Sequence, residues 1–251
     1  MMRTPRRLLT ALTATAAATA AIVAVSSPAA QAAPPQPAKD TVAPYAGPAT
    51  FTSYTNQCYE GASCEVTGSA DAMTGRGTAT AAFRRLVPGG GNSESVYGSA
   101  RQEVSYQVPP GARSVTAVLT WRVASASASA VASAGTLYAT SGVAGAIDGC
   151  ELECSTLPDQ RQMAASDSTY GIPSVPTYMA APRTESLTLT ASGKLPRTLL
   201  LRASAYVIGG GYGELEPCLN YDGCDTLWVA HAGTVDAHVD ATLLSVRIST
   251  S

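Results

Sequence analysis

Hydrophobic and polar residues alternate along much of the chain, which is the pattern of a β-strand with one buried face. In QEVSYQV (102–108) the two Val residues and the Tyr share one side, and in RSVTAVLTWRV (113–123) the apolar residues do so. Between them, Pro109-Pro110-Gly111 interrupts the pattern, because proline cannot donate to a strand ladder and glycine suits a turn. This stretch therefore predicts strand, turn and strand.

The alternation changes phase twice. In ASASASAVASA (124–134), Ser takes the positions that were apolar up to Val123. The run could form an Ala-rich helix, but its period of two and the mediocre helix propensity of Ser favour a strand. Since a one-residue shift exchanges the two faces, we expect a β-bulge near Val123 to Ser125, or a strand that passes between sheets. In 233–250, Leu244, Val246 and Ile248 take over the inward positions after Leu243.

Similar alternation in 185–192 and 197–208, frequent Gly and Pro, and no convincing amphipathic helix predict an all-β fold. We expect a jelly-roll-like antiparallel β-sandwich with disulfide-stapled loops, built as a single domain from residues 49–251. The phrase YQVPPGARSVTAVLTW (106–121) resembles strand-turn-strand segments of secreted bacterial sandwiches, including carbohydrate-binding modules. Abundant Ala, and Arg in place of Lys, are typical of a GC-rich genome such as that of an actinobacterium.

The N-terminus has the features of a secretory signal peptide at residues 1–32. Three arginines precede an apolar Ala-rich segment, and Ala30-Gln31-Ala32 supplies a small-x-small cleavage pattern. Residues 33–48 are rich in Ala and Pro and predict a disordered arm. No second long apolar run follows, so we expect a secreted, extracellular protein without a membrane span.

Without those three arginines, 13 basic residues stand against 18 acidic ones. This balance argues against nucleic acid and anionic membranes as partners. The six cysteines lie in three local pairs, Cys58/Cys64, Cys150/Cys154 and Cys218/Cys224. In an exported chain an even number predicts disulfides, and the clustering favours three short bridges, although the sequence alone allows other pairings. The spacings do not match those of a zinc site.

One loop combines aromatic and acidic side chains, within GGGYGELEPCLNYDGCD (209–225). We take it as a disulfide-closed connection between strands that end near Ile208 and begin near Thr226. Its candidate ligand-binding residues are Tyr212, Glu214, Glu216, Tyr221, Asp222 and Asp225. Asn220, Asp222 and Asp225 could also hold calcium, although the later ligands of an EF-hand loop are missing. No other cofactor is expected.

A second candidate site lies in VDAHVDA (235–241). Asp236, His238 and Asp240 are two residues apart, so they share the polar face of a strand and could bind a divalent metal. The alternative is an ordinary solvated strand face, because residues two apart lie about 6.6 Å from each other.

Catalysis has weaker support. The chain has two histidines, His231 and His238, which an odd offset places on opposite strand faces, and no G-x-S-x-G motif. We therefore expect a non-catalytic extracellular binding or surface module, with glycan or cell-wall material as its ligand. Two alternatives stay open: a hydrolase of extracellular polymers that uses loop carboxylates, and an inhibitor or toxin-like protein that binds another protein. The sequence does not set the oligomeric state.

Overall fold

Strands are the regular elements of every part of the chain that the structure describes. The computed structural model describes residues 39–42, 48–89, 93–150, 154–168, 177–178, 182–212, 215–216, 227–228 and 230–251. None of these residues is helical, so no described segment is a helix that could span a membrane. The all-β prediction is confirmed. The expected signal peptide and most of the expected arm lie outside the described residues, and β1 (Lys39–Val42) falls within that arm.

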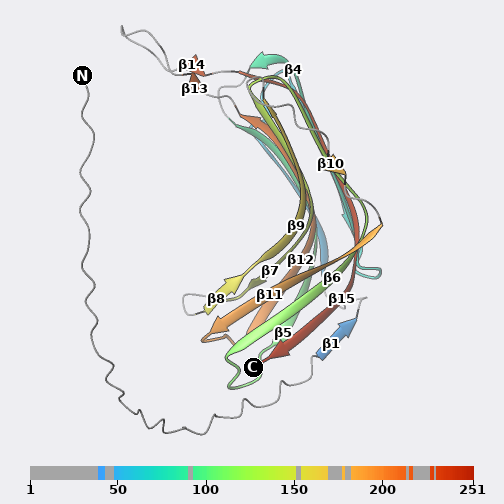
Figure 1. Cartoon of the computed structure of the whole chain (residues 1–251), viewed down its shortest axis with the longest axis vertical. Helices are drawn as coiled ribbons and strands as arrows, with labels where there is room; N and C mark the ends of the chain where they lie inside the picture. The colour runs from blue at the N-terminus through green and yellow to red at the C-terminus, as the bar shows by residue number, and fades with distance from the viewer. Residues whose placement is uncertain are drawn as a thin grey trace, which may run out of the picture. The chain divides into compact units, whose positions relative to one another are not determined.

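The strands form two antiparallel sheets that pack face to face (Figure 1). Sheet A has the order β3 (Ala62–Ala70), β4 (Arg76–Gly89), β15 (His231–Thr250), β6 (Ser114–Ala134), β11 (Arg183–Gly193) and β8 (Cys154–Leu157), with β1 paired to β15 and β10 (Thr177–Tyr178) paired to β6. Sheet B has the order β2 (Ala49–Asn56), β5 (Glu94–Gln107), β12 (Thr198–Tyr212), β7 (Thr136–Asp148) and β9 (Asp159–Ser168). A separate two-stranded pair joins β13 (Leu215–Glu216) and β14 (Leu227–Trp228).

The chain passes repeatedly from one sheet to the other. The run β4-β15-β6-β11 belongs to sheet A and the run β5-β12-β7-β9 to sheet B, and the chain changes sheet between β4 and β5, β6 and β7, and β12 and β15. The predicted antiparallel sandwich is thus confirmed. This order is compatible with jelly-roll connectivity, which itself stays a prediction.

Two β-bulges explain the phase changes in the sequence. Asp240 pairs with Ser125 and Ala241 pairs with Val123, so Ala124 is the extra residue of β6, where the bulge was predicted. A second register shift between Leu243 and Ser245 makes Leu244 the extra residue of β15. The phase change there is confirmed, but the inward placement of Leu244 is wrong, because a bulged residue is left out of the alternation and this one is 40% exposed.

The core between the sheets changes character along the strands. At one end, which we call the leucine end, large apolar side chains from both sheets are fully buried: Leu119, Leu187, Leu189, Leu199, Leu201 and Trp121. In the middle of the strands the buried side chains are small, among them Ala126, Ala128, Ala130, Ala139, Ala205 and Ala237. The Ser/Ala run of β6 buries every second residue here, Ala126, Ala128 and Ala130. This alternation is that of a strand and agrees with the prediction. Beyond them, at the other end, Phe83 and Leu137 are again large and fully buried.

Two of the three predicted disulfides are present among the described residues. Cys58–Cys64 closes the turn between β2 and β3, and Cys150–Cys154 closes the turn between β7 and β8. The first lies near Ser95 and Gly210, and the second lies near Leu200 and Gly193, so they are at opposite ends of the sheets. Cys218 and Cys224 lie outside the described residues, and their pairing stays a prediction.

Candidate functional site

The predicted binding loop connects β12 to β15. Tyr212 is the last residue of β12, past the expected strand end at Ile208, and is 44% exposed. Glu216 is a residue of β13 and pairs with Leu227 of β14. The remaining candidates, Glu214, Tyr221, Asp222 and Asp225, lie outside the described residues together with Asn220, so the calcium site and the loop carboxylates stay predictions.

The glycines that open this loop complete β12 and serve close packing. Gly211 faces inward beneath His231, and a Cβ atom there would lie 2.5 Å from Cδ2 of the His231 ring. Gly210 faces outward beneath Tyr138, where a Cβ atom would lie 2.1 Å from the Glu94 carbonyl oxygen and 3.0 Å from the Tyr138 hydroxyl. Glycine is required at 211 because of the His231 ring and at 210 because of the Glu94 backbone carbonyl, so this part of the glycine run is a closely packed strand.

The predicted metal residues lie on β15, and two of them, His238 and Asp240, already have protein partners. His238 has the Thr80 hydroxyl 3.1 Å from Nδ1 and the Ser125 hydroxyl 2.9 Å from Nε2. Asp240 accepts two hydrogen bonds from Arg76, at 3.0 and 2.7 Å. Asp236 is exposed on the same face. Within the described residues no three His, Cys, Asp or Glu side chains lie close enough to hold a metal ion, so a metal at this face would have to displace the existing contacts.

A group of tyrosines occupies the outer side of sheet B. Because successive residues of a strand point to opposite faces, the residues that alternate with the buried positions of β2, β5, β12 and β7 face away from the core. Five tyrosines do so, and we call this surface the tyrosine face: Tyr54, Tyr97, Tyr138, Tyr206 and Tyr212. Tyr212 was a candidate binding residue from the sequence, whereas the other four tyrosines of this face were not.

Within the tyrosine face the rings are close neighbours. Tyr54 and Tyr97 are direct cross-strand partners in the β2–β5 register, and the ring centroids of Tyr138 and Tyr212 are 6.3 Å apart. Tyr54 is 61% exposed, whereas Tyr206 is only 6% exposed and its hydroxyl donates to Gln162 at 3.1 Å. Burial raises the pKa of the Tyr138 and Tyr206 phenols, which keeps both neutral. The face is therefore aromatic, partly exposed and uncharged.

Among the described residues on this side of sheet B, charged side chains lie only nearer the leucine end. There Arg202 pairs with Asp148 at 2.8 Å and with Glu103 at 3.5 Å, while Arg101 lies 4.0 Å from Glu103. We call these four residues the charged cluster. The register places it from the level of Ser204 onward, on the side of Tyr206 away from Tyr212. The outer side of one sheet is thus divided into an uncharged aromatic part and an ion-paired part.

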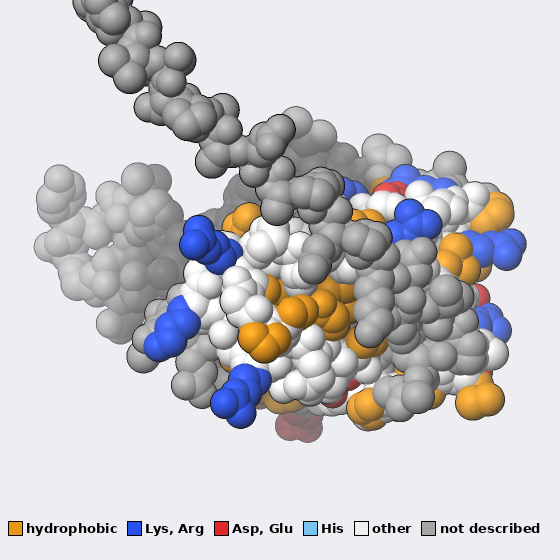
Figure 2. All heavy atoms as spheres, turned by 90° about the horizontal axis from the view of Figure 1, so that it is seen from below, with side chains coloured by type: hydrophobic (Ala, Val, Ile, Leu, Met, Phe, Trp, Pro, Cys, Tyr) orange, Lys and Arg blue, Asp and Glu red, His pale blue; other side chains and the backbone are white. Residues whose placement is uncertain are grey.

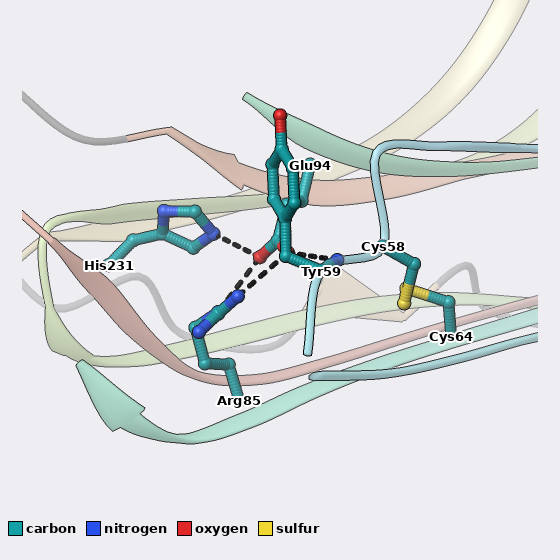
Figure 3. The surroundings of a disulfide bond; sticks show 6 residues. All are labelled: Cys58, Tyr59, Cys64, Arg85, Glu94 and His231. Atoms are coloured by element: carbon teal, nitrogen blue, oxygen red, sulfur yellow. Dashed lines mark hydrogen bonds and ion pairs between the residues drawn. A yellow bond between two sulfur atoms is a disulfide. The ribbon is translucent and has the colours of Figure 1, made fainter. Parts of the chain in front are cut away.

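A buried polar network, which the sequence analysis did not predict, lies between the sheets at the end opposite the leucine end, and we call this end the histidine end (Figure 3). Glu94 is fully buried and accepts two hydrogen bonds from Arg85, both at 2.9 Å. The same carboxylate has Nε2 of His231 at 2.7 Å and accepts from the Tyr59 N–H at 2.8 Å. Tyr59 lies in the turn closed by the Cys58–Cys64 disulfide, so the network ties that turn to β4, β5 and β15.

The electrostatics of this network favour the ionised carboxylate. Burial alone would raise the pKa of Glu94, but the hydrogen bonds from Arg85, from the Tyr59 N–H and from His231 together hold that pKa below its ordinary value. The bond to Glu94 in turn raises the pKa of Arg85. Arg85 is 4% exposed, and Glu94 and His231 are 0% exposed, so a substrate has no access to this group. Its role is to hold the sandwich together.

Sequence reasoning could not assemble this network, although one part of it was correct. The predicted opposite placement of the two histidines is confirmed, since His231 is buried and His238 faces outward. However, Glu94 is 9 residues from Arg85 and 137 from His231, and no spacing rule joins such residues. The useful signal is that Glu94 shares the inward alternation of Val96, so its burial requires a partner.

A shallow hollow lies at the leucine end, between the β5–β6 and β11–β12 turns. It has a volume of about 420 Å³ and is lined by Gln107, Val108, Pro109, Pro110, Gly111, Ala112, Leu195, Pro196 and Arg197. Figure 2 views this end and shows hydrophobic side chains near its middle with Lys and Arg side chains around them. Arg197 is the one charged residue of the lining, so the hollow offers little to orient a polar ligand.

No protein-family model, no curated protein and no solved structure matches the chain.

Proposed function

We propose that the chain is a secreted, non-catalytic β-sandwich module that binds glycan or cell-wall material through the tyrosine face. The observation that carries this proposal is the set of five tyrosines on the outer side of sheet B, two of which, Tyr54 and Tyr212, are more than 40% exposed. An exposed ring presents an apolar surface beside a polar hydroxyl, and so does a sugar ring, so the two stack without leaving a buried polar group unsatisfied. Strands hold the rings in place before the ligand arrives, which reduces the ordering cost of binding.

Among the described residues, two carboxylates that could support catalysis are either buried or already paired. Glu94 is sealed in the core, and Asp240 is bound to Arg76. Secretion is part of the proposal and has support from the signal-peptide pattern at residues 1–32 and from two local disulfides, which persist in oxidising compartments.

The test is a pull-down of the exported protein on insoluble chitin, cellulose and peptidoglycan. We expect the wild-type chain to be retained on at least one of them, and Tyr54→Ala with Tyr212→Ala to reduce retention. Glu103→Gln, in the charged cluster on the same side of the sheet, is the matched control and should be retained like the wild type. If no material retains the wild type, the glycan proposal is wrong.

The same samples separate binding from hydrolysis. Release of soluble reducing sugars from the retained material, abolished by alanine at Glu214, Glu216, Asp222 or Asp225, would make the protein a hydrolase instead. Binding without release of sugar supports the proposed module.

A further inference from the structure

The division of the outer side of sheet B bears on the chemistry of the ligand. The members of the charged cluster pair with one another, near the leucine end. On the other side of Tyr206, the described outward positions of all five strands carry only phenol, hydroxyl, amide and apolar side chains or glycine. A charged ligand there would lose hydration, and no side chain at these described positions carries the opposite charge, so its binding would be costly. The chain beyond residue 32 is also acidic, which disfavours anionic polymers further.

The placement of the tyrosines indicates a ligand longer than one sugar. Tyr54 on β2 and Tyr97 on β5 are at the same level of the sheet, while Tyr138 lies two strands beyond Tyr97, opposite Gly210. Neighbouring strands are about 4.8 Å apart, so the three steps from β2 to β7 span roughly 14 Å. Ile208, directly opposite both Tyr97 and Thr140, continues the surface between them. The rings therefore form an extended row across four strands.

Neutral hydrogen-bonding groups accompany this row. The Tyr54 hydroxyl lies 3.5 Å from Oδ1 of Asn56, and the Tyr206 hydroxyl donates to Oε1 of Gln162. Ser95 lies opposite Asn56 in the strand register. Amides and hydroxyls exchange hydrogen bonds with sugar hydroxyls without introducing charge, which suits orientation of an uncharged ligand.

From this charge distribution and geometry we infer that the tyrosine face binds an uncharged polysaccharide chain laid across β2, β5, β12 and β7, an inference that rests on the glycan-binding function proposed above. The ligand contacts several rings at once, and the hydroxyls and amides between them fix its position. Acidic polysaccharides and charged cell-wall polymers are excluded from this face.

The experiment compares neutral with charged polymers on the full exported chain. Soluble cello-, chito-, xylo- and manno-oligosaccharides form the neutral set, and oligogalacturonate and solubilised peptidoglycan form the charged set, with binding measured by calorimetry at low and at high salt. We expect a neutral oligosaccharide to bind with a Kd that does not change with salt, because salt screens only interactions between charges. A longer oligosaccharide of the same series should bind more tightly than its disaccharide.

Three variants locate the site. Tyr54→Ala and Tyr97→Ala should each weaken binding at least about fivefold, as expected for an aromatic contact at the centre of a binding surface. Tyr54→Phe keeps the ring and should bind within about twofold of the wild type. Because Tyr54 is 61% exposed, its variants should fold, which circular dichroism and the thermal midpoint will show.

The outcomes separate the two claims. If no oligosaccharide of either set binds, the proposed glycan-binding function is wrong. If charged polymers alone bind, or if a neutral ligand binds but Tyr54→Ala and Tyr97→Ala leave its Kd unchanged, glycan binding stands and the present inference is overturned.

Discussion

The two ends of the sandwich are held together by different kinds of interaction. At the leucine end, large apolar side chains from both sheets fill the core, whereas at the histidine end the buried side chains of Arg85, Glu94 and His231 meet in a hydrogen-bonded network. Apolar packing tolerates gradual change, but a buried ionic network fails when one member is removed, because the others remain buried without a partner. Each end also has one described disulfide, so the ends can be compared directly.

The largest effect should follow removal of the carboxylate at the histidine end. We expect Glu94→Ala to lower the free energy of unfolding by about 3–5 kcal/mol, since Arg85 stays buried without its counter-charge. Urea unfolding measures this change. Glu103→Ala is the control, because partly exposed ion pairs contribute only about 0–1 kcal/mol. A loss for Glu94→Ala no larger than that of the control would show that the network does not hold this end.

At the leucine end, Leu119→Ala should cost about 2–5 kcal/mol, because the cavity removes contacts with the opposite sheet. Leu119 is fully buried, and its Cδ1 lies close to Gly145 of β7. The control is Leu86→Ala on β4, where the side chain is 83% exposed and the cost should stay within about 0.5 kcal/mol. Equal losses for the two leucines would contradict the assignment of Leu119 to the core.

The disulfides sharpen the comparison. Loops of this length contribute about 2 kcal/mol each on the chain-entropy estimate, so serine replacement of Cys150 and Cys154 should cost about that amount. Replacement of Cys58 and Cys64 should cost about 1 kcal/mol more, because it also loosens the turn whose Tyr59 N–H donates to Glu94. Chemical denaturation of the two double variants checks this. If the Cys58/Cys64 variant loses no more stability than the Cys150/Cys154 variant, Tyr59 keeps its place without the Cys58–Cys64 bridge.

The smallest expected effect is a difference in pH dependence. The folded-state pKa of Glu94 lies below its ordinary value of 4.5, so this group stabilises the fold above that pH and the contribution is lost as the pH falls through the folded-state pKa. The wild type should therefore lose stability on acidification below about pH 4.5 more steeply than Glu94→Gln. Leu119→Ala should keep the wild-type slope. Parallel curves for the wild type and Glu94→Gln would exclude Glu94 as a source of acid sensitivity.

The sequence predicted what depends on local pattern. Alternation identified the strands around residues 102–123, the strand character of the Ser/Ala run and the bulge at Ala124, because side-chain period is a property of neighbouring residues. Local cysteine pairing was confirmed for Cys58–Cys64 and Cys150–Cys154 for the same reason.

The tyrosine face and the Glu94 network were not predicted, because both arise from strands brought together over long distances in the chain. Tyr54, Tyr97 and Tyr138 become neighbours only once β2, β5, β12 and β7 are in order. The sequence drew attention to Tyr212 because of its loop. The fold places Tyr212 beside Tyr138 on the outer side of sheet B. Leu244 was predicted wrongly for a local reason. Its hydrophobicity suggested burial, but a phase change in the alternation does not tell which residue is the bulged one.

The two bulges on neighbouring strands couple the lengths of β6 and β15. Val131 pairs with Thr234 on one side of the bulges and Leu119 pairs with Val246 on the other, and the extra residue Ala124 in one strand is offset by Leu244 in the other. Deleting either residue alone would leave the two strands one residue out of step beyond that point. Deleting both would restore an unbroken ladder between the Val131–Thr234 pair and the Leu119–Val246 pair, with every other side chain of that stretch on its present face. In this sandwich an insertion in one central strand is thus matched by an insertion in its partner.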